Sequence, residues 1–553
     1  MSKTTPNKKP NVVLILNDDM GYSDIGCYGG EIRTPNLDRL AAHGLRFSSF
    51  YNTARCSPSR ASLLTGLHPH QTGIGILTYD SGPEGYAGNL NHRCVTIPQV
   101  LQANGYRTYM SGKWHVSSNL KTPTDSWPMQ RGFDKFFGTI IGAGSFYDPN
   151  TLTRGNENVE HEARRPGWFY TDAISDQAVA YIDEHCRDTN GKPFFAYVAY
   201  TAPHWPLHAH DEDIARYRGR FDAGWDALRE TRLEKLVASG ILKAHWKLTD
   251  RDPTQPPWRE AEQDEQFRAW TLRCMEVYAA QVDRMDQGIG RVVQALERNG
   301  QLANTLVIFL ADNGACAEDI PEDVTVDELV DKLMIARRET RSGEPVHFGN
   351  DVTRMPGPEN TYQSYGVAWA NLSNAPFRLY KHWIHEGGIS TPLIAHWPAG
   401  IDANENGTIR HAPGYLPDIM ATIVDASGAT YPSTVDGHAV DALEGQSLLP
   451  VFAKDATGEH RRPMFWEHEG NAAVRIGKWK LVRRYPRAWE LYDMDADRTE
   501  LHDLAAGEPE RVRQMAAQYD AWAKRCGVLP RDRIVALMKS QGVTRAFWEK
   551  DEV

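Results

Sequence analysis

The sequence lacks a long apolar run near its start. Residues 1–19 include several basic side chains but no separate apolar stretch followed by a cleavage site. The apolar run at residues 12–16 is too short to cross a membrane. We therefore expect a first β-strand there, in place of a signal peptide or membrane anchor, and a cytoplasmic protein with no membrane partner.

Cysteine is scarce and does not follow a recognisable pattern. The seven cysteines are an odd number, are scattered along the chain and show no metal-type spacing. This usage argues against a disulfide framework and favours reduced thiols.

Positive charge is also in short supply. Lysine and arginine total 61 against 72 acidic residues, a net charge of −11, which argues against a nucleic-acid partner. Hydrophobic residues make up 41% and charged residues 24%, a composition typical of soluble globular proteins. The chain has 553 residues, too many to fold around one small hydrophobic core, so we expect a large domain and a smaller one.

Short strand-type runs alternate with helical patterns over most of the chain, and there is no internal repeat. The strand-type runs are NVVLILNDD, YRTYMSGKWH, KPFFAYVAY, NTLVIFLADNG and STPLIAHWP. Helical patterns include TPNLDRLAAHG, TIPQVLQANG and DRMDQGIGRVVQALERNG. This alternation predicts an α/β fold with a large, mostly parallel mixed sheet sandwiched by helices.

The pattern changes after residue 449. The closely spaced runs MFWEHEG, AAVRIGKWKLVRR and WELYDM predict an antiparallel sheet, and a helical tail follows from about Glu508. We predict a main domain at residues 1–449 and a smaller α+β domain at 450–553. Residues 209–270 and 315–370 are polar and weakly periodic, so we expect insertions that shape a binding site.

Acidic and amide side chains follow two of the predicted strands. Asp18 and Asp19 end the first strand, and Asp312 and Asn313 end the strand of the 300s. Ligands bind beyond the carboxyl ends of strands in open α/β sheets, and a set of oxygen ligands suits Ca²⁺ or Mg²⁺. Taken singly, each pair is better explained as ordinary turn residues. Together they favour a metal site.

Cationic groups and histidines are expected at the same edge of the sheet. Each of them alone could be a surface cation or a satisfied core histidine. Together beside a divalent cation they would bind a compact anion and stabilise charge in a transition state. These residues are Arg60, Lys113, His115, His204 and Lys381.

Cys56 stands just before Pro58 at the expected start of a helix. A thiolate would be stabilised at that helix end, but it is a soft partner for a hard cation. A packed core thiol is the ordinary alternative. An oxygen nucleophile fits better, and oxidation of the cysteine to an aldehyde followed by hydration would supply one.

These residues occur in motifs that resemble those of the type I sulfatase family, which has an alkaline-phosphatase-like fold. CSPSR, continuing to LTG at residues 64–66, is similar to the family's first signature, and GYRT running to GKWH is similar to the second. NDDMGYSD, APHWPL, ADNG and APFRLYK with EGG resemble the remaining site blocks, in the family's order. The apolar and aromatic residues around APHWPLH and APFRLYK most resemble those of bacterial arylsulfatases.

The resemblance implies a role for each residue. Cys56 matches the cysteine that a separate formylglycine-generating enzyme converts to Cα-formylglycine, which also contacts the metal. The matches to the Ca²⁺ ligands are Asp18, Asp19, Asp312 and Asn313. Lys113 and Lys381 match groups that hold sulfate oxygens, and Arg60 and His115 match groups that hold the hydrated aldehyde. His204 matches a histidine near the leaving-group oxygen.

The implied reaction is hydrolysis of a small sulfate monoester. One hydroxyl of the diol, deprotonated by a base such as Asp312, would attack sulfur in line. Either His204 or Lys381 would supply a proton to the leaving alcohol or phenol. His115 would then take a proton from the second hydroxyl, which expels sulfate from the covalent sulfo-enzyme and restores the aldehyde.

Several alternatives stay open at the level of sequence. A phosphodiester or phosphonate monoester hydrolase of the same superfamily would share the metal and the nucleophile. A non-catalytic binder of sulfated ligands would result if Cys56 were not matured, and a cysteine hydrolase would pair Cys56 with a histidine. An aryl sulfate is the expected substrate, with alkyl and carbohydrate sulfates as alternatives, and the sequence leaves the oligomeric state open.

Overall fold

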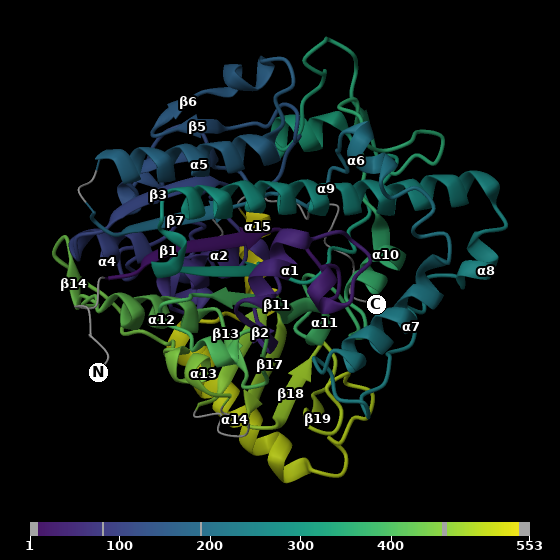
Figure 1. The fold of residues 1–553 in the computed structure, drawn as a ribbon. Coiled ribbons are helices and arrows are strands. Elements are labelled where there is room, and N and C mark those ends of the chain that lie inside the picture. Colours follow the sequence, from purple (N-terminus) through teal and green to yellow (C-terminus); the bar gives the residue numbers. More distant parts are fainter. Residues whose placement is uncertain (1–8, 80–81, 189–190, 456–461, 541–553) are drawn as a thin grey trace.

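A large mixed sheet forms the centre of the computed structural model, which describes residues 9–79, 82–188, 191–455 and 462–540 (Figure 1). In spatial order its strands are β12 (Ile409–Arg410), β2 (Leu45–Tyr51), β11 (Ser390–His396), β8 (Thr305–Ala311), β1 (Asn11–Asn17), β7 (Phe194–Ala199), β3 (Arg107–Gly112), β4 (Lys135–Thr139), β5 (Leu152–Arg154) and β6 (Glu157–Asn158), and β13 (Gly414–Tyr415) also pairs with β2.

The strands of the sheet's middle run in one direction. Neighbouring strands from β8 through β1, β7 and β3 to β4 are all parallel, whereas β11 is antiparallel to both β8 and β2. Because β11 is reversed, its first residue lies at the edge where β8 and β1 end. The prediction of a mostly parallel mixed sheet is confirmed.

Alternate residues of β1 face two different helical layers. Val13 and Ile15 are buried in the core that includes residues of α1, α5 and α9, whereas Val12 and Leu14 are buried with those of α2, α4 and α12. Both faces of the sheet are thus apolar, as the continuous hydrophobic runs predict. The bounds of these helices are α1 (Pro35–Ala42), α2 (Cys56–Thr65), α4 (Ile97–Ala103), α5 (Tyr170–Asp188), α9 (Glu265–Arg298) and α12 (Pro417–Ser427).

Helix α9 starts earlier than its amphipathic C-terminal half indicates. The side chain of Asp264 accepts hydrogen bonds from the backbone N–H groups of Gln266 and Phe267, so it caps a helix of 34 residues. The segment 209–270 is therefore more regular than expected from its weak periodicity, and it also contains α6 (Asp211–Ala215), α7 (Gly224–Ala238) and α8 (Trp258–Ala261). The low share of apolar residues there hid the helices.

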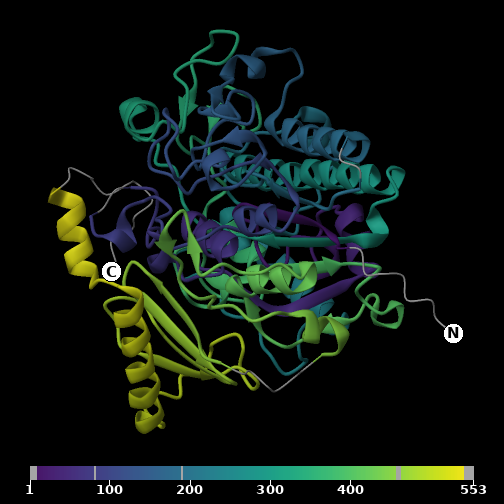
Figure 2. The ribbon, with the colours of Figure 1, turned by 90° about the vertical axis from the view of Figure 1, so that its left-hand side faces the viewer.

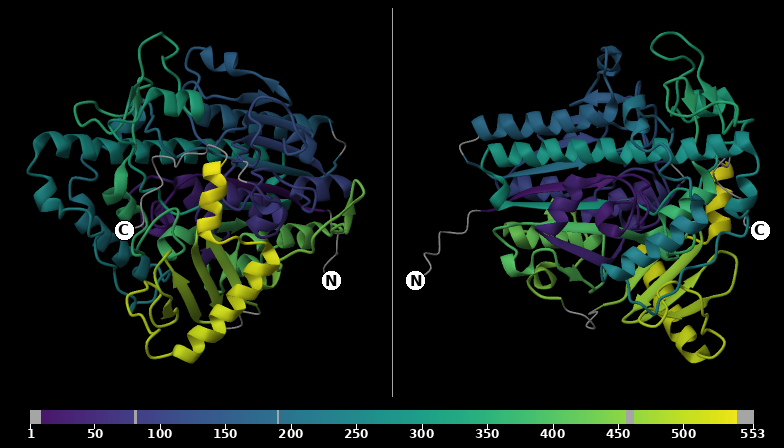
Figure 3. Two further views of the ribbon diagram at one scale, coloured as in Figure 1. Left: turned by 180° about the vertical axis from the view of Figure 1, so that it is seen from behind. Right: turned by 45° about the vertical axis from the view of Figure 1, so that its right-hand side comes forward.

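A second sheet lies beside the first near the C-terminus (Figure 2). It is antiparallel, in the order β16 (Met464–His468), β17 (Asn471–Ile476), β18 (Trp479–Arg483) and β19 (Glu490–Asp493). Helix α14 (Pro509–Cys526) packs on this sheet, and α15 (Arg531–Ser540) extends back over the large unit (Figure 3). The small antiparallel domain is confirmed, while its boundary at residues 449 and 450 stays a prediction.

The remaining short elements lie mostly in the connections. They are α3 (Pro69–Thr72), α10 (Gly366–Ser373), α11 (Glu386–Ile389), α13 (Leu449–Ala453), a π-helix (Asp327–Lys332), β9 (His347–Phe348), β10 (Thr361–Tyr362), β14 (Thr434–Val435) and β15 (His438–Ala439). No helix in the described ranges has both the length and the apolar character needed to cross a membrane.

Candidate active site

The ends of several neighbouring strands meet at one place in the sheet. Asp18 follows β1, Asp312 follows β8 and Lys113 follows β3. Lys381 precedes β11, but because that strand is reversed its N-terminal side lies at the same edge. The structure brings the predicted site residues together there, and all of them are buried except His115, which is partly exposed: Asp18, Asp19, Cys56, Arg60, Lys113, His115, His204, Asp312, Asn313 and Lys381.

Two cationic side chains bind the carboxylates at the floor of the site. Lys113 Nζ donates to Asp18 Oδ2. Arg60 Nη2 donates to Asp312 Oδ2 at 2.8 Å and lies 3.7 Å from Asp18 Oδ2. Burial alone would raise the pKa of Asp18, but Lys113 and the other nearby cations hold it below its usual value.

Asp19 makes a second set of contacts. Its Oδ1 accepts from Asn313 Nδ2 at 2.6 Å, and its Oδ2 lies 2.9 Å from Lys381 Nζ and 3.3 Å from His204 Nε2. Lys381 Nζ and His204 Nε2 are themselves 3.3 Å apart. Burial opposes the charge on Lys381, yet the Asp19 carboxylate raises the pKa of the lysine well above its usual value. An ammonium and an imidazole therefore share one carboxylate.

The acidic set fits a divalent cation. Asp18 Oδ1 and Asn313 Oδ1 are buried oxygens that have no hydrogen-bond partner in the described part of the chain. Burial and the neighbouring Asp18 carboxylate raise the pKa of Asp312 to about 7. The positive charge of the surrounding side chains therefore does not fully compensate the negative charge of these acids. The donors are carboxylate and amide oxygens, the ligands that Ca²⁺ and Mg²⁺ prefer.

Cys56 is the first residue of α2, a helix buried along its whole length. The helix N-terminus, Lys113 and Lys381 favour a thiolate, but burial outweighs them and raises the pKa of the Cys56 thiol. The unmodified side chain is thus a neutral thiol at neutral pH. This weakens the alternative of a cysteine hydrolase.

The two histidines of the site are uncharged at neutral pH. Burial, followed by Lys113, lowers the pKa of His115 well below its usual value, and burial also lowers the pKa of His204. His115 has a backbone φ of 54° and Asp19 one of 64°, a left-handed conformation that is uncommon for residues other than glycine and clusters at functional sites.

A cavity of about 230 Å³ opens above Cys56, His204 and Lys381. Its apolar lining includes Leu77 and Trp205 and extends over Leu120, Ile141, Leu333 and Ile335. Part of this wall comes from the insertion 315–370, in agreement with its predicted role in shaping the site.

Sequence reasoning missed three residues of this cavity. Glu318 Oε1 accepts from Arg55 at 2.7 Å, and Glu318 Oε2 accepts from the Trp205 indole at 3.0 Å and lies 3.7 Å from Lys381 Nζ. Arg55 is next to Cys56 and Trp205 is next to His204, so adjacency was the available signal for both. Glu318 lies in an irregular loop, where no pattern marks it.

Comparisons with known proteins agree with this geometry. The family model described as Sulfatase matches residues 10–429, and that of the C-terminal part of N-sulphoglucosamine sulphohydrolase matches residues 377–521. The chain therefore belongs to the sulfatase family, whose type I members have an alkaline-phosphatase-like fold and hydrolyse sulfate esters, generally with a formylglycine and a divalent metal.

Similar proteins include an arylsulfatase and an uncharacterized sulfatase. An arylsulfatase of Klebsiella aerogenes is 33% identical, over 80% of this chain and 92% of its own. An uncharacterized sulfatase of Schizosaccharomyces pombe is 32% identical, over 96% of each chain. The crystal structure of Ps i-CgsB in complex with k-i-k-neocarrahexaose has a similar fold, with a TM-score of 0.63, 24% identity and 93% of each chain covered.

Proposed function

We propose that this sulfatase acts on aryl sulfates and releases a phenol and inorganic sulfate. The observation that carries the proposal is the apolar part of the cavity wall above Cys56. Leu77, Ile141, Trp205 and Leu333 form a surface that suits a flat apolar leaving group, although the wall also contains polar residues such as Arg55, Glu318 and Lys332. The arylsulfatase of Klebsiella aerogenes supports the same class.

Asp18, Asp19, Asp312 and Asn313 would hold a divalent cation, for which we propose Ca²⁺ with Mg²⁺ as the alternative. When bound there, the cation would supply positive charge beside the reacting sulfate. Conversion of Cys56 to formylglycine by a formylglycine-generating enzyme would supply an oxygen nucleophile with a second hydroxyl for the release of sulfate. That enzyme is the proposed maturation partner.

The cationic side chains bind and orient the sulfate group. Lys113 and Lys381 contact its oxygens and stabilise the negative charge that shifts onto them and onto the leaving oxygen. Arg60 holds the hydrated side chain at position 56 and fixes the Asp312 carboxylate, with which it is paired at 2.8 Å. Asp312 accepts the proton of the attacking hydroxyl.

Proton transfer divides between the two sides of the site. The leaving oxygen receives its proton from the Lys381 ammonium, directly or relayed through His204, whose Nε2 lies 3.3 Å from Lys381 Nζ beside Asp19. On the other side, the neutral His115 accepts a proton from the second hydroxyl at position 56. Its Nδ1 is buried without a partner in the described part of the chain.

Kinetics on matched substrates test the proposal. On fully matured protein with Ca²⁺, we expect kcat/KM for an aryl sulfate to exceed those for an alkyl sulfate, a sugar sulfate and an aryl phosphonate monoester. A higher value for the phosphonate would support the phosphonate or phosphodiester alternative. A higher value for the sugar sulfate would overturn the aryl class.

The location of the protein in the cell and the maturation of Cys56 are also part of the proposal. None of the seven cysteines, all of which lie in the described ranges, forms a disulfide, which fits the proposed cytoplasmic location. If intact-mass analysis after coexpression with the maturing enzyme showed an unmodified Cys56, the chain would be a binder of sulfated ligands instead of an enzyme.

A further inference from the structure

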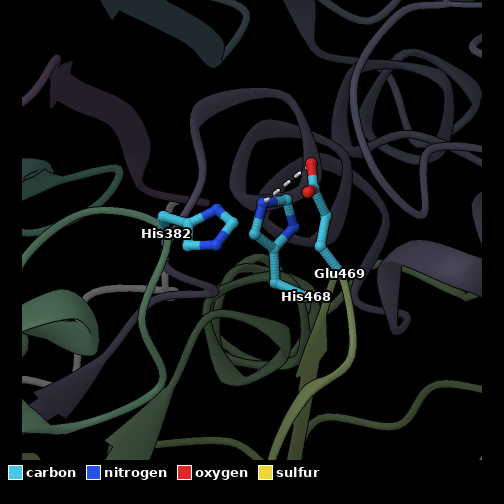
Figure 4. Close-up of side chains that lie close together, drawn as sticks. All are labelled: His382, His468 and Glu469. Carbon is cyan, nitrogen blue, oxygen red and sulfur yellow. Dashed lines mark ion pairs between the residues drawn. The ribbon is translucent and has the colours of Figure 1, made fainter. Parts of the chain in front are cut away.

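A second group of possible metal ligands lies beside the active site but outside it. His382 directly follows Lys381, whereas His468 ends β16 and Glu469 begins the turn to β17. Figure 4 shows the three side chains pointing toward one another, and each offers a ligand atom within 4.8 Å of the others. His468 is fully buried and Glu469 is 3% exposed. None of the three takes part in the proposed sulfatase reaction.

His468 is the observation that points to a ligand. Both of its ring nitrogens are buried and neither makes a hydrogen bond within the described residues. A buried polar group without a partner costs about 1–3 kcal/mol, so such groups are rarely kept without a reason. The free nitrogen lone pair of a neutral imidazole is also a good metal ligand.

Glu469 is oriented as a metal-binding carboxylate would be. Its Oε2 lies 2.7 Å from Arg531 Nη2 on α15, while its Oε1 lies 3.8 Å from His468 Nε2. One oxygen is thus paired with a guanidinium by distance, without a hydrogen bond within the described residues, and the other lies nearer His468. Charged neighbours of this kind are common around metal ligands. The backbone of Glu469 has a φ of 50°, a costly conformation that holds the side chain in this position.

His382 completes the group. Its ring is nearly perpendicular to that of His468, with an angle of 83° and 5.3 Å between centroids. Its Nε2 lies 3.3 Å from the amide Nδ2 of Asn471, a long contact that a metal bond could replace. Its backbone N–H donates to Ala54 O at 2.7 Å, which anchors the segment beside Cys56.

We propose that His382, His468 and Glu469 form a site for Zn²⁺ or a similar transition-metal ion. Two imidazoles and one carboxylate suit zinc and not calcium, and they leave a fourth position for water. The site differs in chemistry from the oxygen-lined site at Asp18. The proposal does not depend on the sulfatase reaction, because its test measures metal binding and not enzyme activity.

Cobalt binding tests the proposal on the full-length protein. After removal of metals with a chelator, the protein is saturated with Ca²⁺ and then titrated with Co²⁺, a spectroscopic substitute for Zn²⁺. We expect one equivalent of Co²⁺ per chain, a visible absorption band typical of a low-coordinate site, and displacement by Zn²⁺. Failure of the wild-type protein to take up Co²⁺ or Zn²⁺ under these conditions would overturn the proposal.

Variants place the ion. His468→Gln and the nearly isosteric Glu469→Gln should each lose the absorption band, and Arg531→Gln should weaken binding by about tenfold because Glu469 loses its orienting partner. The matched control is His396→Gln, which replaces another buried histidine with an unpartnered Nδ1 and should leave the band unchanged. A wild-type band in both His468→Gln and Glu469→Gln would show that the ion binds elsewhere and would overturn the proposal.

Discussion

Gly142 lies against the imidazole ring of His115. A Cβ atom added at Gly142 would come within 2.1 Å of His115 Cε1 and 2.3 Å of its Nε2. The Gly142→Ala variant should therefore displace the ring, and we expect kcat/KM to fall roughly 10²-fold, the effect of moving a catalytic group by about 1 Å. Kinetics on an aryl sulfate would measure the change.

A neighbouring glycine provides the control for this variant. A Cβ at Gly144 would meet no atom closer than 3.5 Å, so Gly144→Ala should keep the wild-type activity. Both variants should keep the wild-type thermal midpoint. If Gly142→Ala were as active as Gly144→Ala, the position of the His115 ring would not matter for the reaction.

The second hydroxyl at position 56 is the reason for proposing a modified cysteine. Cys56→Ser keeps one oxygen nucleophile but has no second hydroxyl to expel sulfate. We expect this variant to release at most one phenol per chain and then stop, with sulfate bound at residue 56 in the intact mass. Sustained turnover by the serine variant would contradict the mechanism.

Removal of His204 should affect substrates according to their leaving group. A poor leaving group needs a proton as its bond to sulfur breaks, whereas an activated phenol does not. For His204→Ala we expect a loss of about 10²-fold or more in kcat/KM with an alkyl sulfate and a much smaller loss with a nitrophenyl sulfate. Equal losses on both substrates would remove the acid role from His204.

Strand ends explain why so much of the site could be predicted. Asp18 and Asp312 follow strongly apolar strands, and the carboxyl ends of parallel strands meet at one edge. Lys381 reaches the same edge for a different reason, since β11 is antiparallel, and the sequence alone does not give that direction. The alternation of strands and helices likewise predicted the sheet, because the spacing of apolar residues and the length of each run distinguish strands from helices.

Contacts between distant segments could not be predicted in the same way. Glu318 reaches Lys381 from an irregular loop whose conformation depends on tertiary packing. His468 and Glu469 approach His382 from the small domain, and no local pattern encodes how two domains pack. Residues of this kind have to be read from the structure.

A network of buried ion pairs joins the domain of the large sheet to the small C-terminal domain. Glu386, on α11, lies 2.9 Å from Lys480 Nζ on β18 and 2.9 Å from Arg498 Nε, and all three are buried. Glu386→Ala would take from buried Arg498 its carboxylate partner, whereas Lys480 would keep Glu500 at 2.8 Å, and we expect the variant to lower the free energy of unfolding by about 3 kcal/mol.

Urea unfolding followed by tryptophan fluorescence would measure that loss. The exposed pair of Glu510 and Arg513 provides the control, since Glu510→Ala removes an ion pair of the same kind in water and should leave the unfolding midpoint unchanged. A wild-type midpoint for Glu386→Ala would show that the network does not stabilise the fold.

The pH dependence of stability should report on Asp286, a buried carboxylate on α9. Its oxygens accept hydrogen bonds from the backbone N–H groups of Asn36 at 3.1 Å and Leu37 at 2.8 Å, at the start of α1. Burial nevertheless dominates and raises the pKa of Asp286 to about 6, against about 3.9 in an unfolded chain.

The folded protein therefore binds a proton at Asp286 over a range in which the unfolded chain has released it. This contribution to stability is fully present below about pH 4 and is lost as the pH rises through about 6. In Asp286→Asn the contribution is absent at every pH. The difference in unfolding free energy between wild type and variant should thus fall by about 2–3 kcal/mol from pH 4 to pH 7. Urea unfolding of both proteins across this range would measure it, and a constant difference would show that Asp286 titrates normally in the fold.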